Sequence, residues 1–218
     1  MEIILKAFLA SELPDDVRSK VIEEHRWINV DYDWWESLID EFIHDMQKAY
    51  GVVLEKEKIE FDLDRGGHVK YNGSFWMNVE ACKDKVRTLR EIYSLIATAA
   101  MLEPELAQQV KESIDDMEVG YERGNLSITW SDVYGEDENK MDPFDALAHI
   151  LNDDHCTSLP DELEGELKGL IDDEFQKLLN QLRSEYEYLT SDECVVETLN
   201  ANGYLFTEAG QWIPRVGL

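Results

Sequence analysis

The sequence has few cysteines, few basic residues and no long apolar run. Its three cysteines, Cys82, Cys156 and Cys194, are odd in number and widely spaced, which excludes a disulfide framework and a CxxC zinc site. No apolar stretch reaches the roughly 20 residues that a membrane-spanning helix needs. The apolar start is interrupted by Glu2 and Lys6 and lacks the pattern of a signal peptide, so we expect a cytoplasmic protein.

Basic residues are scarce relative to acidic ones. The 218-residue chain has 20 Lys and Arg against 48 Asp and Glu, which gives a formal charge of −28. Proteins bind DNA, RNA and anionic membranes through Lys and Arg, so this charge argues against direct binding to any of them. The charge also far exceeds the roughly 2–8 that suffices for solubility. We therefore expect that the negative charge serves to bind a partner.

The motifs of common enzyme classes are also missing. The chain has no Gly-x-Ser-x-Gly elbow, no P-loop and no dinucleotide-binding glycine pattern. The run from His149 to Cys156 contains zinc-ligand residue types, but their spacing matches no common zinc site. The run from Asp62 to Gly73 begins like a calcium loop but has glycine at two ligand positions, which predicts a plain hairpin turn. We predict no catalytic residues, no metal and no cofactor.

The patterns that are present predict an α+β fold, with a small, mostly antiparallel sheet of about four to six strands packed against several helices. Alternating residues predict strands at 2–9 and 125–130, a hairpin at 58–79 and a terminal hairpin at 204–213. Helical periodicity predicts helices at 15–28, at 33–50, at 84–117 in two segments joined near Glu103, at 160–189 and at 191–202.

These elements group into three segments that we expect to pack as one domain. Residues 1–130 form an N-terminal unit of strands and helices, and residues 131–158 form an acidic flexible loop with a short helix near 144–151. Residues 159–218 supply the long amphipathic helix, a short helix and the terminal hairpin. The leucine stripe of the long helix looks only partly covered by these elements, which predicts a homodimer.

Acidic residues concentrate in the second half of the chain. From Ser131 to Glu174 there are fifteen acidic and two basic residues, a local charge of −13. Carboxylates spaced along a helix can imitate phosphates, so we expect this surface to bind a basic, nucleic-acid-binding protein. A solvated helix face with no partner is the alternative. The candidate partner-binding acids are Asp137, Glu138, Asp153, Asp154, Asp161, Glu162, Glu164, Glu166, Asp172 and Asp173.

Four of these acids, Asp161, Glu162, Glu164 and Glu166, lie off the leucine stripe, so we expect that neutralising them leaves the fold intact. Trp34 is a further candidate. Adjacent helical residues point about 100° apart, so one ring of the Trp34–Trp35 pair can enter the core while the other lies at its edge. An edge tryptophan is a typical hot spot for a partner. Core packing of both rings is the alternative.

Several segments of the chain resemble a known family. The stretches Asn29–Glu36, Phe61–Gly67, Glu185–Glu193 and Asn200–Tyr204 are similar, in order and spacing, to a family of small acidic phage proteins. Members of this family are often labelled antitoxins of a toxin–antitoxin stability system. The resemblance implies a phage-encoded protein of the host cytoplasm. With the acidity of the chain, it favours an anti-defence inhibitor of a host or defence protein.

Two other functions stay open at this point. A protein that sequesters a signalling nucleotide would need a basic, aromatic pocket around Arg65, His68 and Lys70. A metal-dependent hydrolase would use paired carboxylates to hold magnesium or to transfer protons. The pairs available for this chemistry are Asp115–Asp116, Asp153–Asp154 and Asp172–Asp173.

Overall fold

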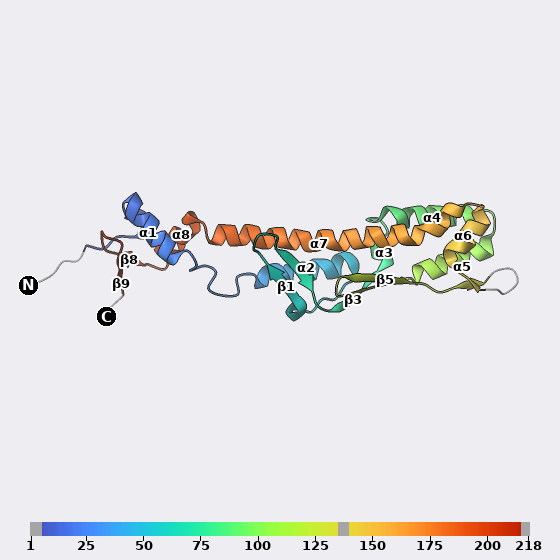
Figure 1. Cartoon of the computed structure of the whole chain (residues 1–218), viewed down its shortest axis with the longest axis horizontal. Helices are drawn as coiled ribbons and strands as arrows, with labels where there is room; N and C mark the ends of the chain where they lie inside the picture. The colour runs from blue at the N-terminus through green and yellow to red at the C-terminus, as the bar shows by residue number, and fades with distance from the viewer. Residues whose placement is uncertain (1–5, 135–139, 215–218) are drawn as a thin grey trace, which may run out of the picture. The chain divides into compact units, whose positions relative to one another are not determined.

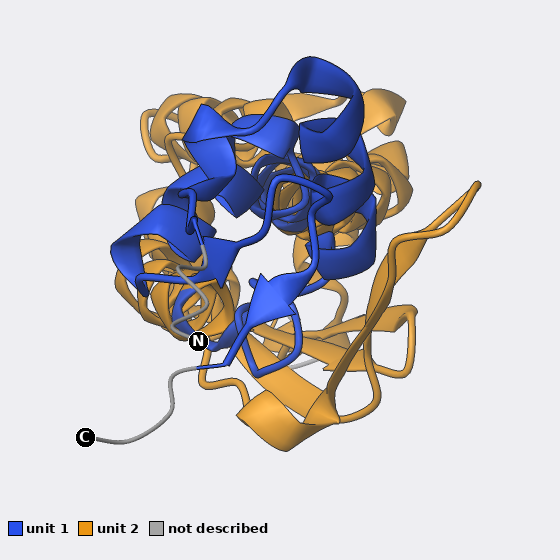
Figure 2. Ribbon diagram, turned by 90° about the vertical axis from the view of Figure 1, so that its left-hand side faces the viewer, with its two compact units in different colours: residues 1–37, 180–218 blue, residues 38–179 orange. Residues whose placement is uncertain are grey.

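The fold is α+β, as predicted (Figure 1). In a computed structural model of the chain, residues 6–134 and 140–214 are described. The chain divides into two compact units: unit 1 contains residues 1–37 and 180–218, and unit 2 contains residues 38–179 (Figure 2). Within the described ranges, no helix combines the length and the apolar character needed to cross a membrane.

Unit 1 is built from both ends of the chain. Phe8 and Phe206 exchange two backbone hydrogen bonds of 2.9 Å, which join the N-terminal segment to the terminal hairpin. Its core is formed by Ala10, Leu13, Val21, Ile22, Val195, Leu199 and Phe206. Its elements are η1 (Ala10–Glu12), α1 (Asp15–His25), residues 180–189 of α7, α8 (Asp192–Ala201), β8 (Leu205–Phe206) and β9 (Trp212–Ile213).

The helices of unit 2 follow the predicted periodicity. α2 buries Ile39, Phe42 and Met46 on one face, and α5 begins with Pro104 in its first turn, where a proline costs no hydrogen bond. The helical elements of unit 2 are α2 (Glu36–Tyr50, except its first two residues), η2 (Lys56–Lys58), α3 (Val79–Cys82), α4 (Arg87–Ala99), α5 (Pro104–Asp115), α6 (Pro143–Leu151), η3 (Asp154–Ser158) and residues 159–179 of α7.

The strands are antiparallel and are distributed over small sheets. β1 (Ile59–Asp62) pairs with β2 (His68–Tyr71), which confirms the first part of the predicted hairpin. β3 (Ser74–Asn78) instead pairs with β4 (Glu118–Glu122), which also pairs with β5 (Asn125–Thr129). This sheet of three strands is the largest in the described part of the chain.

The sequence pattern does not predict β4, because Gly120 lies at its centre and glycine is disfavoured in strands. In the sheet, Gly120 lies directly opposite Trp76. A Cβ atom at Gly120 would come within 2.9 Å of Trp76 Cζ3. The glycine therefore leaves room for the indole.

Residues 131–158 contain more regular structure than we predicted. The predicted short helix is α6, and the described part of the segment also contains β6 (Val133–Tyr134), β7 (Lys140–Met141) and η3. Asp142 caps α6, because its carboxylate accepts hydrogen bonds from the Phe144 N–H (2.8 Å) and from Trp130 Nε1 (2.6 Å). The cap and the buried Phe144 ring hold this segment on unit 2.

α7 (Leu159–Leu189) confirms the predicted long helix. Leu163, Leu167 and Leu178 of its apolar stripe are fully buried within the chain. The sequence predicts a homodimer because this stripe looks only partly covered. These leucines, however, are already buried within the chain. The oligomeric state stays a prediction.

Candidate functional site

Three aromatic rings meet on unit 1, where the segment after α1 contacts the end of α7. The ring centroids of Trp27 and Tyr186 are 6.2 Å apart, and those of Trp34 and Tyr186 are 5.8 Å apart. Trp27 is 56% exposed, while Trp34 and Tyr186 are half-buried. We call these three residues the aromatic row.

Two side chains anchor this segment to the end of α7. The Arg26 guanidinium donates a hydrogen bond to the Thr190 carbonyl (2.7 Å), and Asn29 Nδ2 donates one to the Leu189 carbonyl (3.1 Å). Carbonyls at the end of a helix lack partners within it and carry the negative end of the helix dipole, so both contacts are stabilising. The backbone on each side of Trp27 is therefore fixed.

The charge of Arg26 is balanced within the chain. Its guanidinium forms ion pairs with Glu23 and with Asp192, the latter at 2.8 Å, and the hydrogen bonds that it donates to these two carboxylates raise the pKa of Arg26. Asp31 and Asp33 of the same segment are exposed. Aromatic faces beside exposed carboxylates attract cations, so the aromatic row suits a partner that carries Arg or Lys.

The sequence predicts only part of this site. Trp34 was a candidate, although it lies just before α2, which begins at Glu36, and not within a helix as expected. Trp27 and Tyr186 were not predicted, because their partnership depends on the packing of distant segments. The signal available was the density of aromatic residues, since Trp27, Tyr32, Trp34 and Trp35 fall within nine positions.

The acidic candidates separate into exposed carboxylates and carboxylates engaged within unit 2. Asp137 and Glu138 lie outside the described residues. Asp153 accepts a hydrogen bond from the His155 N–H (3.0 Å) at the start of η3. The described candidates that are exposed are Asp153, Asp154, Asp161, Glu164, Asp172 and Asp173.

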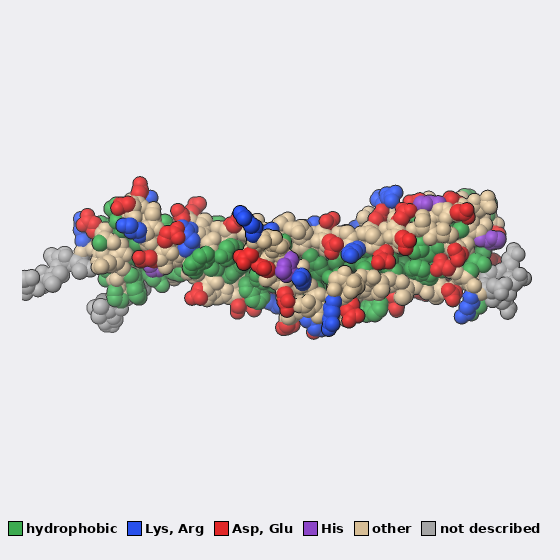
Figure 3. All heavy atoms as spheres, viewed as in Figure 1, with side chains coloured by type: hydrophobic (Ala, Val, Ile, Leu, Met, Phe, Trp, Pro, Cys, Tyr) green, Lys and Arg blue, Asp and Glu red, His purple; other side chains and the backbone are tan. Residues whose placement is uncertain are grey.

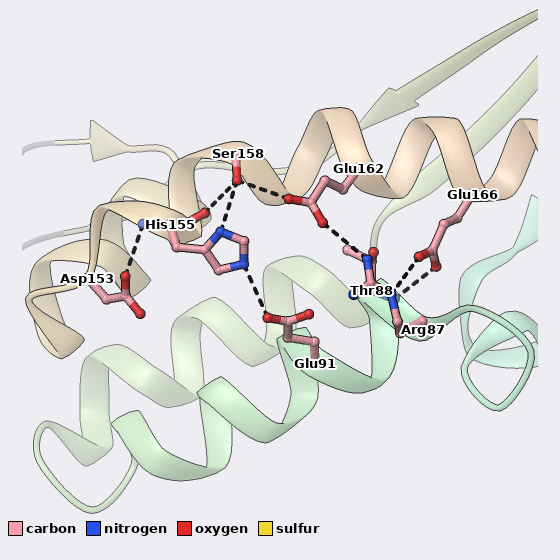
Figure 4. A network of polar contacts seen from close by, with 8 residues as sticks. All are labelled: Arg87, Thr88, Glu91, Asp153, His155, Ser158, Glu162 and Glu166. Atoms are coloured by element: carbon pink, nitrogen blue, oxygen red, sulfur yellow. Dashed lines mark hydrogen bonds and ion pairs between the residues drawn. The ribbon is translucent and has the colours of Figure 1, made fainter.

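Glu166, in contrast, caps the N-terminus of α4. Its carboxylate accepts a hydrogen bond from the Thr88 N–H (2.9 Å) and forms an ion pair with Arg87 (3.1 Å), as Figure 4 shows. Val86, which precedes α4, provides no capping side chain, so α7 supplies the missing cap. Burial raises the pKa of Glu166, but the bonds from Thr88 and Arg87 outweigh this effect and hold the pKa below its ordinary value.

The same network continues through Ser158 and His155 (Figure 4). Ser158 Oγ lies 3.2 Å from His155 Nδ1 and 3.2 Å from Glu162 Oε1, and His155 Nε2 lies 3.2 Å from Glu91 Oε1. Serine, imidazole and carboxylate are the groups of a nucleophilic triad. Ser158 Oγ also lies 2.9 Å from the His155 carbonyl, and its single hydroxyl proton can be donated to only one of these acceptors at a time. The group connects η3 to α4 through His155 and Glu91, and to α7 through Ser158 and Glu162.

Glu162 and Glu166 are thus part of the fold. Glu162 forms an ion pair with Arg87 (3.4 Å), which also pairs with Glu166. We expected that Asp161, Glu162, Glu164 and Glu166 can all be neutralised without effect on the fold, but the contacts of Glu162 and Glu166 with α4 predict that neutralising these two weakens the packing of α7 on α4. Asp161 and Glu164 are exposed and remain candidates for partner binding.

The residues considered as metal ligands have structural roles or are dispersed. The segment from Asp62 to Gly67 is the predicted hairpin turn: the Asp64 N–H donates to Asp62 Oδ1 (2.9 Å), and Gly66 has a φ of +91°. Among the described residues, no cluster of three or more His, Cys, Asp or Glu is arranged to hold a metal ion. The three cysteines are free and buried, and burial raises the pKa of Cys82 to about 11.

One pocket of unit 2 involves residues named from the sequence. It has a volume of about 310 Å³ and is lined by residues of β2, β4 and α7. His68 and Lys70, which the nucleotide hypothesis named, line this pocket together with Asp172. Arg65, the third residue of that hypothesis, lies in the turn between β1 and β2 and is exposed.

The chain matches no protein-family model, no curated protein and no solved structure.

Proposed function

We propose that this chain is a binding protein that captures a basic, nucleic-acid-binding protein and thereby inhibits it. The aromatic row of unit 1 would make the main contact, and the exposed carboxylates would attract the partner. The observation that carries the proposal is the exposed Trp27 ring against Tyr186, on a segment fixed by Arg26 and Asn29.

The aromatic row has the properties of a binding hot spot. Tryptophan and tyrosine dominate such hot spots because they offer a large contact area and few rotatable bonds. An Arg or Lys placed over an indole face contributes about 0.5–2 kcal/mol, depending on how far the pair is removed from water. The anchors on the end of α7 lower the entropy that the row loses when a partner binds.

The charge distribution supports a basic partner. Unit 1 has fifteen acidic and six basic residues, and unit 2 has 33 acidic and 14 basic residues, so both units are negatively charged. Figure 3 shows carboxylates spread over the visible face with hydrophobic side chains among them. Such a surface speeds the approach of a basic protein, and the effect weakens as salt screens the charges. Asp161, Glu164 and Asp173 would contribute to this attraction.

A basic surface of the required kind is typical of proteins that bind nucleic acids. A chain that covers this surface would compete with the nucleic acid for it. The chain would therefore inhibit the nucleic-acid-binding protein. The resemblance to acidic phage proteins suggests a host or defence protein as the target.

The test is quantitative capture from a bacterial lysate with three forms of the full chain: the unmodified protein, Trp27→Ala and Trp76→Ala. Trp76 is a matched control, because it is 62% exposed, compared with 56% for Trp27, and lies in unit 2. We expect a basic protein to be recovered by the unmodified chain and by Trp76→Ala. Its recovery with Trp27→Ala should fall at least roughly tenfold, because a hot-spot tryptophan contributes about 2 kcal/mol or more. Equal recovery by all three forms would contradict the proposal.

A further inference from the structure

The pocket of unit 2 is lined by side chains of opposite charge together with aromatic and apolar side chains. His68 and Lys70 line it from β2, and Asp172 lines it from α7. We propose that this pocket binds a small zwitterion with an aromatic body, of the class of the aromatic amino acids. This inference rests on no part of the proposed function, because its residues differ from those of the aromatic row.

The wall on α7 follows from helical spacing. Asp172, Phe175 and Leu179 lie at positions i, i+3 and i+7, which share one face of a helix. Asp172 is exposed at the rim, whereas Phe175 and Leu179 are buried. The helix therefore presents a carboxylate at the opening and apolar carbon beneath it.

The aromatic rings that line the pocket pack against neighbouring aromatic rings. Tyr121 of β4 lines the pocket and stacks on Phe75, with ring centroids 4.6 Å apart and planes 12° apart. The ring of Phe175 lies 6.4 Å from that of Tyr121 and 5.5 Å from that of Phe42. These contacts fix the two rings, so the pocket offers a preformed surface for a planar ligand.

The charges and the size of the pocket select the class of ligand. The carboxylate of an amino acid would face Lys70 and His68, its ammonium group would face Asp172, and its ring would lie on Tyr121 and Phe175. Charge-assisted hydrogen bonds at both ends would fix its orientation. The volume of about 310 Å³ is at the small end of the range for ligand sites, which favours a small metabolite.

A nucleotide fits these observations less well. Its phosphates carry several negative charges, whereas the basic side chains of the lining are Lys70 and His68. The 33 acidic and 14 basic residues of unit 2 add long-range repulsion for a polyanion. A zwitterion has no net charge and escapes this repulsion.

The experiment titrates the full chain with phenylalanine and with two of its fragments. Binding is measured by calorimetry and by amide NMR. The fragment 3-phenylpropionate lacks the ammonium group, and phenethylamine lacks the carboxylate. We expect phenylalanine to bind with saturation and to shift the amide signals of Lys70 and Asp172. Each fragment should bind about tenfold more weakly, because each loses one charge-assisted contact.

Two variants make the result specific to the pocket. Asp172→Asn should weaken phenylalanine binding about tenfold and should remove its advantage over 3-phenylpropionate. Asp173→Asn is the matched control, because it makes the same charge change at the next position of α7, about 100° around the helix and outside the lining. It should leave binding unchanged.

Three outcomes would overturn the inference. The first is the absence of saturable binding by phenylalanine, tyrosine and tryptophan at millimolar concentration. The second is an equal loss of affinity in Asp172→Asn and Asp173→Asn, which would indicate a general charge effect. The third is saturable binding of AMP or ATP where the amino acids do not bind, which would favour the nucleotide hypothesis. None of these outcomes bears on capture by the aromatic row, so the two proposals fail separately.

Discussion

In unit 1 the end of α7 receives its cap from another segment, whereas in unit 2 α7 supplies the cap of another helix. Arg26 and Asn29 reach the last carbonyls of α7 from the segment that carries Trp27. Glu166 reaches the first turn of α4 from the middle of α7. In both units a polar side chain from a distant part of the chain caps the end of a helix.

The two caps differ in whether the residues proposed for binding make the cap or lie beside it. In unit 1 the capping residues, Arg26 and Asn29, flank the exposed Trp27, which belongs to the proposed binding site. In unit 2 the capping residue, Glu166, is itself one of the acids that the sequence suggests for partner binding, but its carboxylate is already engaged by Thr88 and Arg87. The residue type alone does not tell which charges are available to a partner.

The largest expected effect on stability comes from breaking the cap in unit 1. Asn29 is 7% exposed, and Asn29→Ala leaves the Leu189 carbonyl without this donor. We expect the free energy of unfolding to fall by about 1–3 kcal/mol, the usual effect of an unsatisfied buried polar group. Urea unfolding followed by circular dichroism measures it. A change below about 0.5 kcal/mol, the range typical of ordinary surface substitutions, would show that the segment is held by other contacts.

Removal of the cap in unit 2 should have a smaller, pH-dependent effect. Glu166→Ala should lower the free energy of unfolding at pH 7 by about 1 kcal/mol, the usual contribution of a helix cap. Because the folded state holds the pKa of Glu166 below its ordinary value, this contribution is present above the unfolded pKa and is lost as the pH falls through the folded pKa. The difference between the variant and the unmodified chain should therefore shrink at acidic pH.

Thermal unfolding from pH 7 to acidic pH measures this difference, with Glu164→Gln as the control. Glu164 is exposed on the same helix, so its replacement should change the unfolding free energy by less than about 0.5 kcal/mol. If the two variants behave alike at every pH, the capping role of Glu166 is wrong.

The smallest expected effect is a gain in stability from α7 itself. A Cβ atom at Gly165 would meet no atom within 4 Å, so alanine fits there without a clash. Gly165→Ala should raise the free energy of unfolding by roughly 0.4–1 kcal/mol, because alanine restricts the unfolded chain and favours the helix. Differential scanning calorimetry measures the gain in stability. A loss of stability would indicate that a methyl group at position 165 does not fit in this turn of α7.

Local patterns predicted the helices well. The leucine spacing predicted α7, and Ser191, whose side chain accepts a hydrogen bond from the Cys194 N–H (3.2 Å), marked the start of α8. β4 was missed because the reason for Gly120 is Trp76, on a different strand. A pattern within one segment cannot show a contact made by another.

The same limit applies to the candidate site. Trp34 could be predicted from its own neighbours, but the role of Asn29 depends on a carbonyl 160 positions away. The role of Glu166 depends on an amide 78 positions away. Charge density along the chain therefore identified acidic segments correctly but could not separate the carboxylates that hold the fold from those that remain exposed.

The most direct test of the account is the kinetics of the captured partner with three forms of the chain. We expect Trp27→Ala to raise the dissociation rate about 30-fold, which corresponds to about 2 kcal/mol, with little change in the association rate. The triple variant Asp161→Asn, Glu164→Gln and Asp173→Asn should instead slow association and reduce its dependence on salt. An unchanged dissociation rate in Trp27→Ala would contradict the claim that the aromatic row makes the main contact.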